Sequence, residues 1–300
     1  MNFVIITHVQ HIKDNTKYYG YAPYVREMNI WLKYVDNVTV VAPIENIKLD
    51  AIHLDYNHKN LKFKEVQNFN TTSFLNSLQT FFKVPAILWT IFWAMKNADH
   101  IHLRCPGNMG LLGCMVQVLF PKIPKTAKYA GNWDPNAKQP FTYKIQKWIL
   151  NNTFLTKNMK VLVYGEWEGS SKNIKPFFTA TYSEVKKEAI LPRSVKGKIN
   201  FVFVGTLSIG KMPLYAIQLV ENLKKAGQNV QLSLFGDGGL RNELEVYVAT
   251  NKLNDFIFLR GNQNKETIEQ AYKESHFLIL ASKSEGWPKV VAEAMFWGCL

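Results

Sequence analysis

The stretch from Phe277 to Met295, FLILASKSEGWPKVVAEAM, contains a strand signal, a loop signal and a helix signal in that order. Residues 277–281 form a continuous apolar run, which is typical of a strand buried on both faces. Gly286 and Pro288 keep the next residues out of a helix, and proline is tolerated in a first helical turn, where its missing N–H costs nothing. The stretch therefore predicts a strand–loop–helix unit whose helix begins near Pro288.

Two glutamates of this unit are eight positions apart. We expect Glu285 in the loop over the helix N-terminus and Glu293 in the second helical turn. The free backbone N–H groups of residues 286–290 point the same way, and a helix N-terminus attracts anions. Carboxylates beside it can accept hydrogen bonds from sugar hydroxyls. This spacing is common by chance, so the prediction depends on the strand, loop and helix taken together.

Similar units fill the rest of the chain. The apolar pattern predicts strands at 2–7, 38–42, 100–103, 126–130, 161–164, 199–204, 230–235 and 256–259. Between them it predicts helices at 22–34, 73–96, 108–119, 140–151, 213–226, 240–251 and 266–274. Repeated strand–helix units imply α/β architecture with parallel, doubly wound sheets and right-handed crossovers.

A polar, charged segment, EVKKEAILPRSVKGK at 184–198, is the best linker candidate because a new strand follows it at once. We therefore predict an N-terminal Rossmann-like domain over residues 1–190 and a second one over residues 191–300. A doubly wound domain normally continues with another strand after a helix such as the one near Met295. We accordingly expect the second domain to be incomplete at Leu300.

The net charge of +13 is unevenly spread along the 300 residues. Residues 1–197 carry an excess of 12 basic side chains, and residues 198–300 an excess of one. A positive face of this kind suits anionic partners such as acidic lipid head groups or an anionic glycan. The alternative is a basic surface without a partner.

The longest apolar stretch, Val84–Met95, is too short to span a bilayer. Lysines flank it at positions 83 and 96, and it contains Trp89 and Trp93. A buried helix is the favoured interpretation. An interfacial helix that contacts a membrane surface remains the alternative.

The three cysteines, Cys105, Cys114 and Cys299, have no metal-ligand spacing. A sparse, odd set is typical of a reducing compartment, so we predict a cytoplasmic protein. The N-terminus reads as a first strand and lacks the pattern of a signal peptide. The histidines and acidic residues show no metal-ligand spacing either, so we predict that the protein uses neither a metal ion nor a cofactor.

Three motifs together resemble a known family. Residues 284–295 resemble the E-x7-E signature of the retaining glycosyltransferases with the GT-B fold, family 4 in the usual classification. FVGTLSIGK at 203–211 is similar to the V-G-R-L loop of that family, and FGDGGLR at 235–241 to its G-x-G-x-L-R turn. The first domain fits through its order of elements. The resemblance implies two Rossmann-like domains that face each other across a cleft, with a UDP- or GDP-sugar bound mainly to the second.

The resemblance also implies roles for single residues. Lys211 would neutralise the donor diphosphate, where charge develops as the glycosidic bond breaks. Glu293 would bind the ribose hydroxyls, and Glu285 would hold the transferred sugar. Gly205 and Gly236 would let the backbone approach the ligand closely. The remaining donor contacts implied are Thr206, Gly286, Trp287, Pro288, Lys289 and Val290.

The chain departs from the family pattern at two places. Thr206 stands where the family often has arginine, so one of two phosphate-binding cations is absent. Many relatives have a histidine near the donor sugar, in the place where this chain has Gly-Asn-Trp-Asp at 131–134. Asn132 and Asp134 join Glu285 and Lys211 as candidate catalytic residues that orient acceptor or sugar hydroxyls. Equally, this pair could serve turn formation only.

Several histidines carry a structural interpretation. His8 and His11 are interpreted as loop residues, and His276 as structural. His102 and Arg104 end a predicted strand, beyond whose carboxyl end ligands of such sheets bind. We expect Arg104 to contact phosphate and His102 to be satisfied in the core.

The function predicted is retaining transfer of a hexose from a nucleotide sugar to a glycan or lipid-linked glycan acceptor in cell-envelope polysaccharide synthesis. The basic first domain would contact the inner membrane surface peripherally. One alternative is a nucleotide-sugar epimerase of the same fold, which would need a catalytic histidine in the cleft. The other is a non-catalytic basic fragment that binds a membrane or glycan. Patterns typical of nucleic-acid binding are absent.

Overall fold

The computed structural model describes residues 1–67, 74–190 and 192–300, and all of their side chains except those of residues 74–82. The expected helix start at residue 73 and the predicted domain start at Leu191 lie outside the described residues. The chain forms two compact units. Unit 1 comprises Met1–Leu49 and His53–Phe178, and unit 2 comprises Asp50–Ile52 and Thr179–Leu300.

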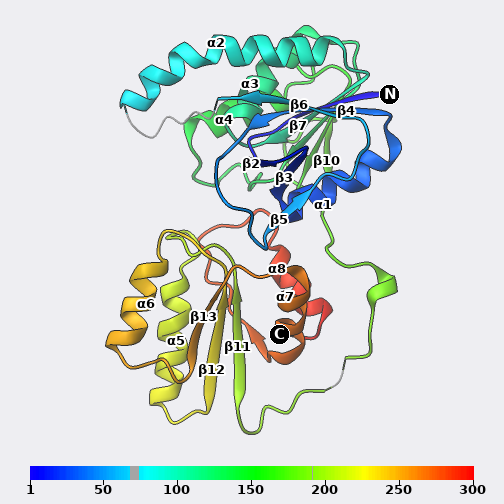
Figure 1. Cartoon of the computed structure of the whole chain (residues 1–300). Coiled ribbons are helices and arrows are strands. Elements are labelled where there is room, and N and C mark those ends of the chain that lie inside the picture. Colours follow the sequence, from blue (N-terminus) through cyan, green and yellow to red (C-terminus); the bar gives the residue numbers. More distant parts are fainter. Residues whose placement is uncertain (68–73, 191) are drawn as a thin grey trace. The chain divides into compact units, whose positions relative to one another are not determined.

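Unit 1 contains a parallel sheet with the strand order β10-β9-β8-β7-β1-β4-β6 (Figure 1). Its strands are β1 (Asn2–Ile6), β4 (Asn37–Pro43), β6 (Leu61–Val66), β7 (His100–Cys105), β8 (Lys125–Tyr129), β9 (Met159–Val163) and β10 (Ile174–Pro176). Its helices are α1 (Ala22–Trp31), α2 (Phe74–Lys96), α3 (Asn108–Val116) and α4 (Phe141–Leu150), with short 3-10 turns at Leu32–Tyr34 and Gln117–Leu119. Parallel strands buried on both faces confirm the α/β prediction, because apolar runs without alternation suit such a sheet.

Two apolar clusters cover the faces of this sheet. On one face, Ile6, Leu103 and Val161 pack with α2, α3 and α4, which lie together over the sheet in Figure 1. On the other face, Phe3 and Val40 pack against α1. The sequence-based helices at 22–34 and 108–119 therefore exist, but their last turns are 3-10 helices.

A small antiparallel sheet in unit 1 was not expected from the sequence. It has the order β2-β3-β5, with β2 (His11–Asp14), β3 (Lys17–Tyr21) and β5 (His53–Asp55). The turn between β2 and β3 places Asn15 at φ 51°, a left-handed conformation that asparagine tolerates. The prediction missed the hairpin because it treated this segment as a loop.

Unit 2 contains a parallel sheet with the order β13-β12-β11-β14. Its strands are β11 (Ile199–Val204), β12 (Val230–Phe235), β13 (Ile257–Gly261) and β14 (Phe277–Leu278), and its helices are α5 (Pro213–Lys225), α6 (Arg241–Thr250), α7 (Lys265–Glu274) and α8 (Lys289–Phe296). In Figure 1, α5 and α6 lie on one side of this sheet and α7 and α8 on the other. The strand expected at 277–281 ends early, because the chain turns toward the loop after β11, where the Lys283 N–H donates to the Gly210 carbonyl (2.9 Å).

The segment that follows Phe178 packs on the rest of unit 2. Arg193 donates from Nε to the Lys273 carbonyl (2.9 Å) and from Nη2 to the Trp297 carbonyl (2.7 Å). The ring of Tyr182 stacks on that of Phe296 with centroids 5.0 Å apart. The compact units divide at residues 178 and 179, whereas the sequence analysis divides the chain at 190 and 191. The short 3-10 turn Glu184–Lys186 lies within this segment.

Candidate functional site

Two glycine-containing loops meet at the carboxyl edge of the unit 2 sheet, after β11 and β12. The Gly205 N–H donates to the Phe235 carbonyl (2.9 Å), and the Leu207 N–H to the Asp237 carbonyl (3.0 Å). Gly236 has φ +133°, and a Cβ placed there would lie 2.0 Å from the Gly205 carbonyl oxygen. The close approach that Gly236 permits in this structure is therefore backbone against backbone.

Lys211 lies in the loop that leads from Gly205 to α5. Its backbone N–H donates to the Ser208 carbonyl (3.0 Å), which closes a turn. Its Nζ forms an ion pair and hydrogen bond with Glu285 Oε1. The two side chains keep 35% and 21% of their surface exposed, so a ligand can reach both. The structure thus brings together two of the four candidate catalytic residues.

The loop that carries Glu285 ends where α8 begins. Pro288 has φ −77° and ψ 80° and stands immediately before Lys289, the first helical residue. The helix therefore begins one residue later than expected, and Pro288 precedes its first turn instead of lying within it. The Trp287 indole N–H donates to the Thr179 carbonyl (3.1 Å), which fixes this loop against the start of unit 2. Gly286 is partly buried in the same loop, and Val290 follows as the second helical residue.

Glu293 is the fifth residue of α8, as expected for the second turn. Its Oε1 accepts a hydrogen bond from the Thr181 hydroxyl, and its Oε2 one from the Tyr272 hydroxyl (3.4 Å). Burial and the nearby Glu293 carboxylate raise the pKa of Tyr272, so this phenol remains a neutral donor. Glu293 is therefore a carboxylate already held by two hydroxyl groups.

Thr206, the position where the family often has arginine, is exposed in the loop after β11.

Asn132 and Asp134 lie in unit 1, in the loop after β8. Asn132 Oδ1 accepts from the Asp134 backbone N–H (2.9 Å), and Asp134 Oδ1 accepts from the Asn136 N–H (2.8 Å). Gln139 Nε2 donates to the Asn132 carbonyl. These contacts are the turn chemistry that the sequence analysis left open as one of two interpretations.

A buried charged cluster in unit 1 was missed by the sequence analysis. The Lys128 ammonium lies 2.5 Å from Glu27 Oε1, and both side chains are nearly inaccessible. Arg104 lies 4.0 Å from Glu27 Oε2 and 5.4 Å from the Tyr24 ring centroid. This cluster thus joins two basic side chains, from β7 and β8, to one carboxylate from α1. No sequence signal reveals it, because Glu27 and Lys128 are 101 positions apart.

His102 is buried in the core, as expected. Its Nδ1 is 2.9 Å from the Thr126 hydroxyl, while its Nε2 has no partner among the described residues. Burial first, and then the charge of Arg104, lower the pKa of His102 to about 3. This ring is therefore neutral at pH 7.

His276, in unit 2, also has structural contacts, since its Nδ1 accepts a hydrogen bond from the Asn200 N–H (3.1 Å).

A small pocket of about 230 Å³ lies at the carboxyl edge of the unit 1 sheet. His8 follows β1 and Gly107 follows β7, two adjacent parallel strands whose connections run to opposite sides. Ligands of such sheets bind at this switch point. Burial and the Arg104 charge lower the pKa of His8 to about 4, so its imidazole is neutral. His8, which we had interpreted as a loop residue, therefore lines a candidate site; its position directly after the first strand was the available signal.

Among the described residues, no group of three or more histidine, cysteine, aspartate and glutamate side chains could hold a metal ion. Within the same residues, no helix is both long and apolar enough to cross a bilayer.

The comparisons with known proteins agree with the geometry of unit 2. Residues 186–300 match the family model "Glycosyl transferases group 1". Protein CapJ of Staphylococcus aureus is 20% identical over 298 residues, which cover 96% of this chain and 74% of that protein. The lipopolysaccharide 1,6-galactosyltransferase of Escherichia coli K12 is 27% identical over 115 residues, which cover 37% of this chain and 32% of that protein. The matched segment thus spans less than a third of the second relative.

A solved structure extends the likeness to nearly the whole chain. Anabaena HepE, solved in complex with UDP-glucose, aligns with a TM-score of 0.64 and 14% identity, covering 99% of this chain and 79% of HepE. At this identity the likeness shows the fold alone. The chain therefore has the fold of the GT-B glycosyltransferases, while the match to a family model is confined to residues 186–300.

Proposed function

We propose that this chain is a retaining glycosyltransferase that moves a hexose from a UDP- or GDP-sugar to a glycan or lipid-linked glycan acceptor of the cell envelope. The observation that carries the proposal is the Lys211–Glu285 ion pair beside the two interlocked glycine loops. It places a cation and a carboxylate where ligands of parallel sheets bind. The match of residues 186–300 to the glycosyl transferases group 1 model and the likeness to the galactosyltransferase support the reaction class, and the likeness to HepE supports the fold.

The proposed roles follow from the contacts of each side chain. The donor diphosphate takes over the Lys211 ammonium, and the released Glu285 accepts bonds from hydroxyls of the transferred sugar. Ribose hydroxyls replace the Thr181 hydroxyl at Glu293, because one hydroxyl donor substitutes for another at little cost. No residue of this set requires a metal ion, so we expect donor binding without one.

The acceptor belongs to unit 1 in this proposal. The pocket between His8 and Gly107 offers a neutral imidazole that can contact a hydroxyl group. The positive potential of Arg104 and Lys128 favours an acceptor that carries phosphate or carboxylate. We expect contact with a cytoplasmic membrane surface through α2, a helix that carries exposed tryptophans.

The test is calorimetric titration of UDP, GDP and their common sugar conjugates, without added metal, into the wild type and Glu293→Ala. We expect one nucleotide to bind saturably to the wild type and at least about tenfold more weakly to the variant. Glu269→Ala is the matched control, because Glu269 is a partly buried unit 2 glutamate whose contact is an ion pair with Lys273. This control should bind as the wild type does.

Each outcome of the titration leads to a different conclusion. Saturable binding that is lost only in Glu293→Ala supports the donor site and identifies the base. A folded wild type that binds none of these nucleotides contradicts the transferase proposal. Equal losses in Glu293→Ala and Glu269→Ala would show that Glu293 acts through the stability of unit 2 and does not contact the donor.

A further inference from the structure

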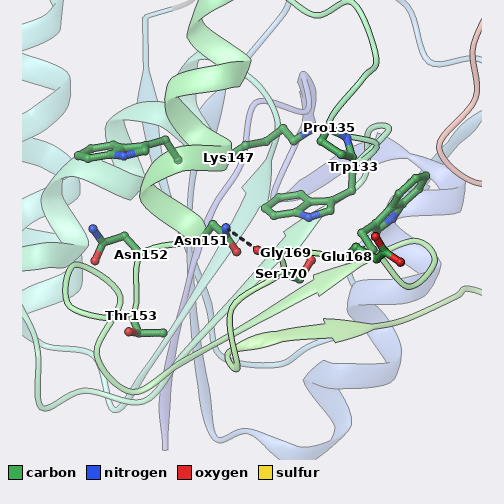
Figure 2. A pocket seen from close by; sticks show the side chains of 11 residues that line it. Trp133, Pro135, Lys147, Asn151, Asn152, Thr153, Glu168, Gly169 and Ser170 are labelled. Atoms are coloured by element: carbon green, nitrogen blue, oxygen red, sulfur yellow. Dashed lines mark hydrogen bonds between the residues drawn. The ribbon is translucent and has the colours of Figure 1, made fainter.

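Unit 1 contains a larger pocket, of about 560 Å³, on the flank of α4. Parallel strands are usually joined by a crossover that contains a helix. The crossover from β9 to β10 instead consists of residues 164–173, which the structure describes without a helix. This irregular segment covers the flank of α4 incompletely, and the pocket is the space that remains (Figure 2).

The floor of this pocket is formed by Trp133 and the groups packed against it. The Trp133 indole is 5% exposed and packs edge-on against Tyr129, with ring centroids 4.9 Å apart. Lys147 Nζ lies 5.4 Å from the Trp133 centroid and donates to the Asp134 carbonyl (3.0 Å). Figure 2 shows the Trp133 ring between the Lys147 side chain and the loop that carries Gly169 and Ser170. The Trp133 ring is thus held at the bottom of the pocket, where only a small part of it is accessible.

The wall opposite α4 is tied to it. Asn151 Nδ2 donates to the Gly169 carbonyl (3.4 Å), the bond drawn in Figure 2. Asn151 Oδ1 accepts from the Ser171 N–H (2.8 Å) and hydroxyl (2.9 Å). The Trp167 indole N–H donates to the Tyr164 carbonyl (2.7 Å), which fixes a second indole in the lining. These bonds preorganise the walls before any ligand arrives.

The remaining lining groups combine apolar faces with polar side chains. Trp148 is 64% exposed and adds a third indole. Glu168 is exposed and Ser170 is partly buried, and both line the pocket. A pyranose ring has an apolar C–H face with partial positive charge, which suits the negative face of an indole. Its hydroxyls need acceptors and donors at the rim, which Glu168 and Ser170 supply.

We propose that this pocket is a second carbohydrate-binding site, separate from the donor site in unit 2, that holds a pyranose residue of a glycan chain. That the bound glycan is the acceptor of the transfer reaction rests on the proposed function. The binding itself does not, because the pocket is built from unit 1 residues alone. Its volume lies in the range of small-molecule sites, about 300–1,000 Å³.

The experiment titrates a panel of sugars into the full chain without nucleotide. The probes are the methyl glycosides of glucose, galactose and N-acetylglucosamine, with cellobiose, lactose and diacetylchitobiose. Binding is read by saturation-transfer NMR and by tryptophan fluorescence. We expect at least one probe to bind the wild type, and Trp148→Ala to weaken it at least about tenfold. Glu168→Gln should weaken it several-fold, since a charged acceptor becomes neutral.

Trp89→Ala is the matched control, because Trp89 on α2 is 65% exposed, as Trp148 is at 64%. It should bind the sugar as the wild type does. All variants should bind the nucleotide with unchanged affinity, which shows that unit 2 is intact. If no probe binds the wild type, or if Trp89→Ala weakens binding as much as Trp148→Ala, the inference is wrong. Nucleotide titration decides the proposed function separately, so the two failures cannot be confused.

Discussion

Gly236 shows at residue scale how the backbone shapes the two loops that follow β11 and β12. Its positive φ disfavours any other residue, and a Cβ there would lie 2.0 Å from the Gly205 carbonyl oxygen. We predict that Gly236→Ala destabilises the chain by at least about 2 kcal/mol, because the loops must separate. The same variant should lose nucleotide affinity. Denaturant unfolding and calorimetry measure the two effects.

Gly239 provides the control, since a Cβ added there would meet no atom within 4 Å and its φ is not in the left-handed region. Gly239→Ala should leave stability and affinity within about 0.5 kcal/mol of the wild type. Equal effects at both glycines would contradict the explanation from the Gly205 contact.

His102 links stability to pH. Its folded-state pKa of about 3 lies below the unfolded value of about 6.5, so the unfolded state binds more protons in acid. The stability contributed by the neutral ring is complete above pH 6.5 and is lost as the pH falls toward 3. At pH 5 we expect a loss of about 2 kcal/mol relative to pH 7.5 from this residue. His102→Gln, which cannot titrate, should show a correspondingly flatter pH profile in denaturant unfolding.

Thr126→Val is the control for this experiment. It removes the hydroxyl that lies 2.9 Å from His102 Nδ1 but keeps the titrating ring. Its stability profile should keep the acid slope of the wild type. An unchanged slope in His102→Gln would show that other groups carry the acid sensitivity.

The sequence could predict the local placement of candidate site residues only where motif and local structure coincide. Lys211, Glu285 and Glu293 belong to short motifs beside a strand end, and the structure places each in a loop or in the first turns of a helix. Their partners were not predictable, because Thr181 lies 112 positions from Glu293. The role of His8 was missed for a similar reason: only the topology of the sheet shows that it lines a switch-point pocket.

At the scale of elements, periodicity predicted the long strands and helices well. The strands of the parallel sheets are apolar runs, and burial on both faces explains why. The six-residue β6 alternates apolar and charged residues (LKFKEV) and was not predicted as a definite strand, and the three-residue β10 has little pattern to read. β14 was predicted too long, because the run after Leu278 is apolar but packs in a loop and does not extend the sheet. Apolar character alone does not distinguish a buried strand from a buried loop.

α2 is the element that we expect to contact a membrane. Trp89 and Trp93 are 65% and 39% exposed, and Lys96 Nζ lies 4.4 Å from the Trp93 centroid. Exposed tryptophans beside lysines suit the interface of an anionic bilayer. We predict that the chain sediments with phosphatidylglycerol vesicles, and that the Trp89→Ala and Trp93→Ala double variant binds them at least about tenfold more weakly.

The controls test whether vesicle binding depends on the position of the exposed tryptophans and on charge attraction. Trp148→Ala removes an equally exposed tryptophan from α4 and should leave vesicle binding unchanged. Added salt should weaken binding, because the charge attraction is screened. Binding that persists in the double variant would assign the membrane contact to another surface.

At the scale of the whole molecule, charge and chemistry are divided between the units. The excess of 12 basic residues lies in residues 1–197, while the motifs that resemble donor-binding sequences lie beyond residue 202. Arg104 and Lys128 accord with this division, since two basic side chains of unit 1 share one carboxylate, Glu27, and such an excess of positive charge favours anionic ligands. Composition alone shows the imbalance, but only the fold shows that part of it is buried.

The reaction itself gives the last prediction, which requires both units. Lys211 forms an ion pair with Glu285, and in the proposed function Lys211 contacts the donor diphosphate while Glu285 holds the transferred sugar. In the proposed retaining transfer, the bond from the anomeric carbon to the diphosphate breaks, the acceptor oxygen bonds that carbon on the same face, and the leaving phosphate takes the acceptor proton. We expect anomeric proton couplings in the NMR spectrum of the product to match those of the donor. Lys211→Ala should slow transfer by at least about a hundredfold, because the developing charge loses its cation.

Lys225→Ala is the control for this loss, because Lys225 forms a comparable ion pair with Glu221 on α5. It should transfer at the wild-type rate. An inverted product would contradict retention while leaving glycosyl transfer in place. Donor incubated alone distinguishes the epimerase: appearance of an epimerised sugar with free nucleotide would replace the transferase proposal, because a transferase without acceptor can release the sugar only by hydrolysis, which leaves the configuration of its other carbons unchanged.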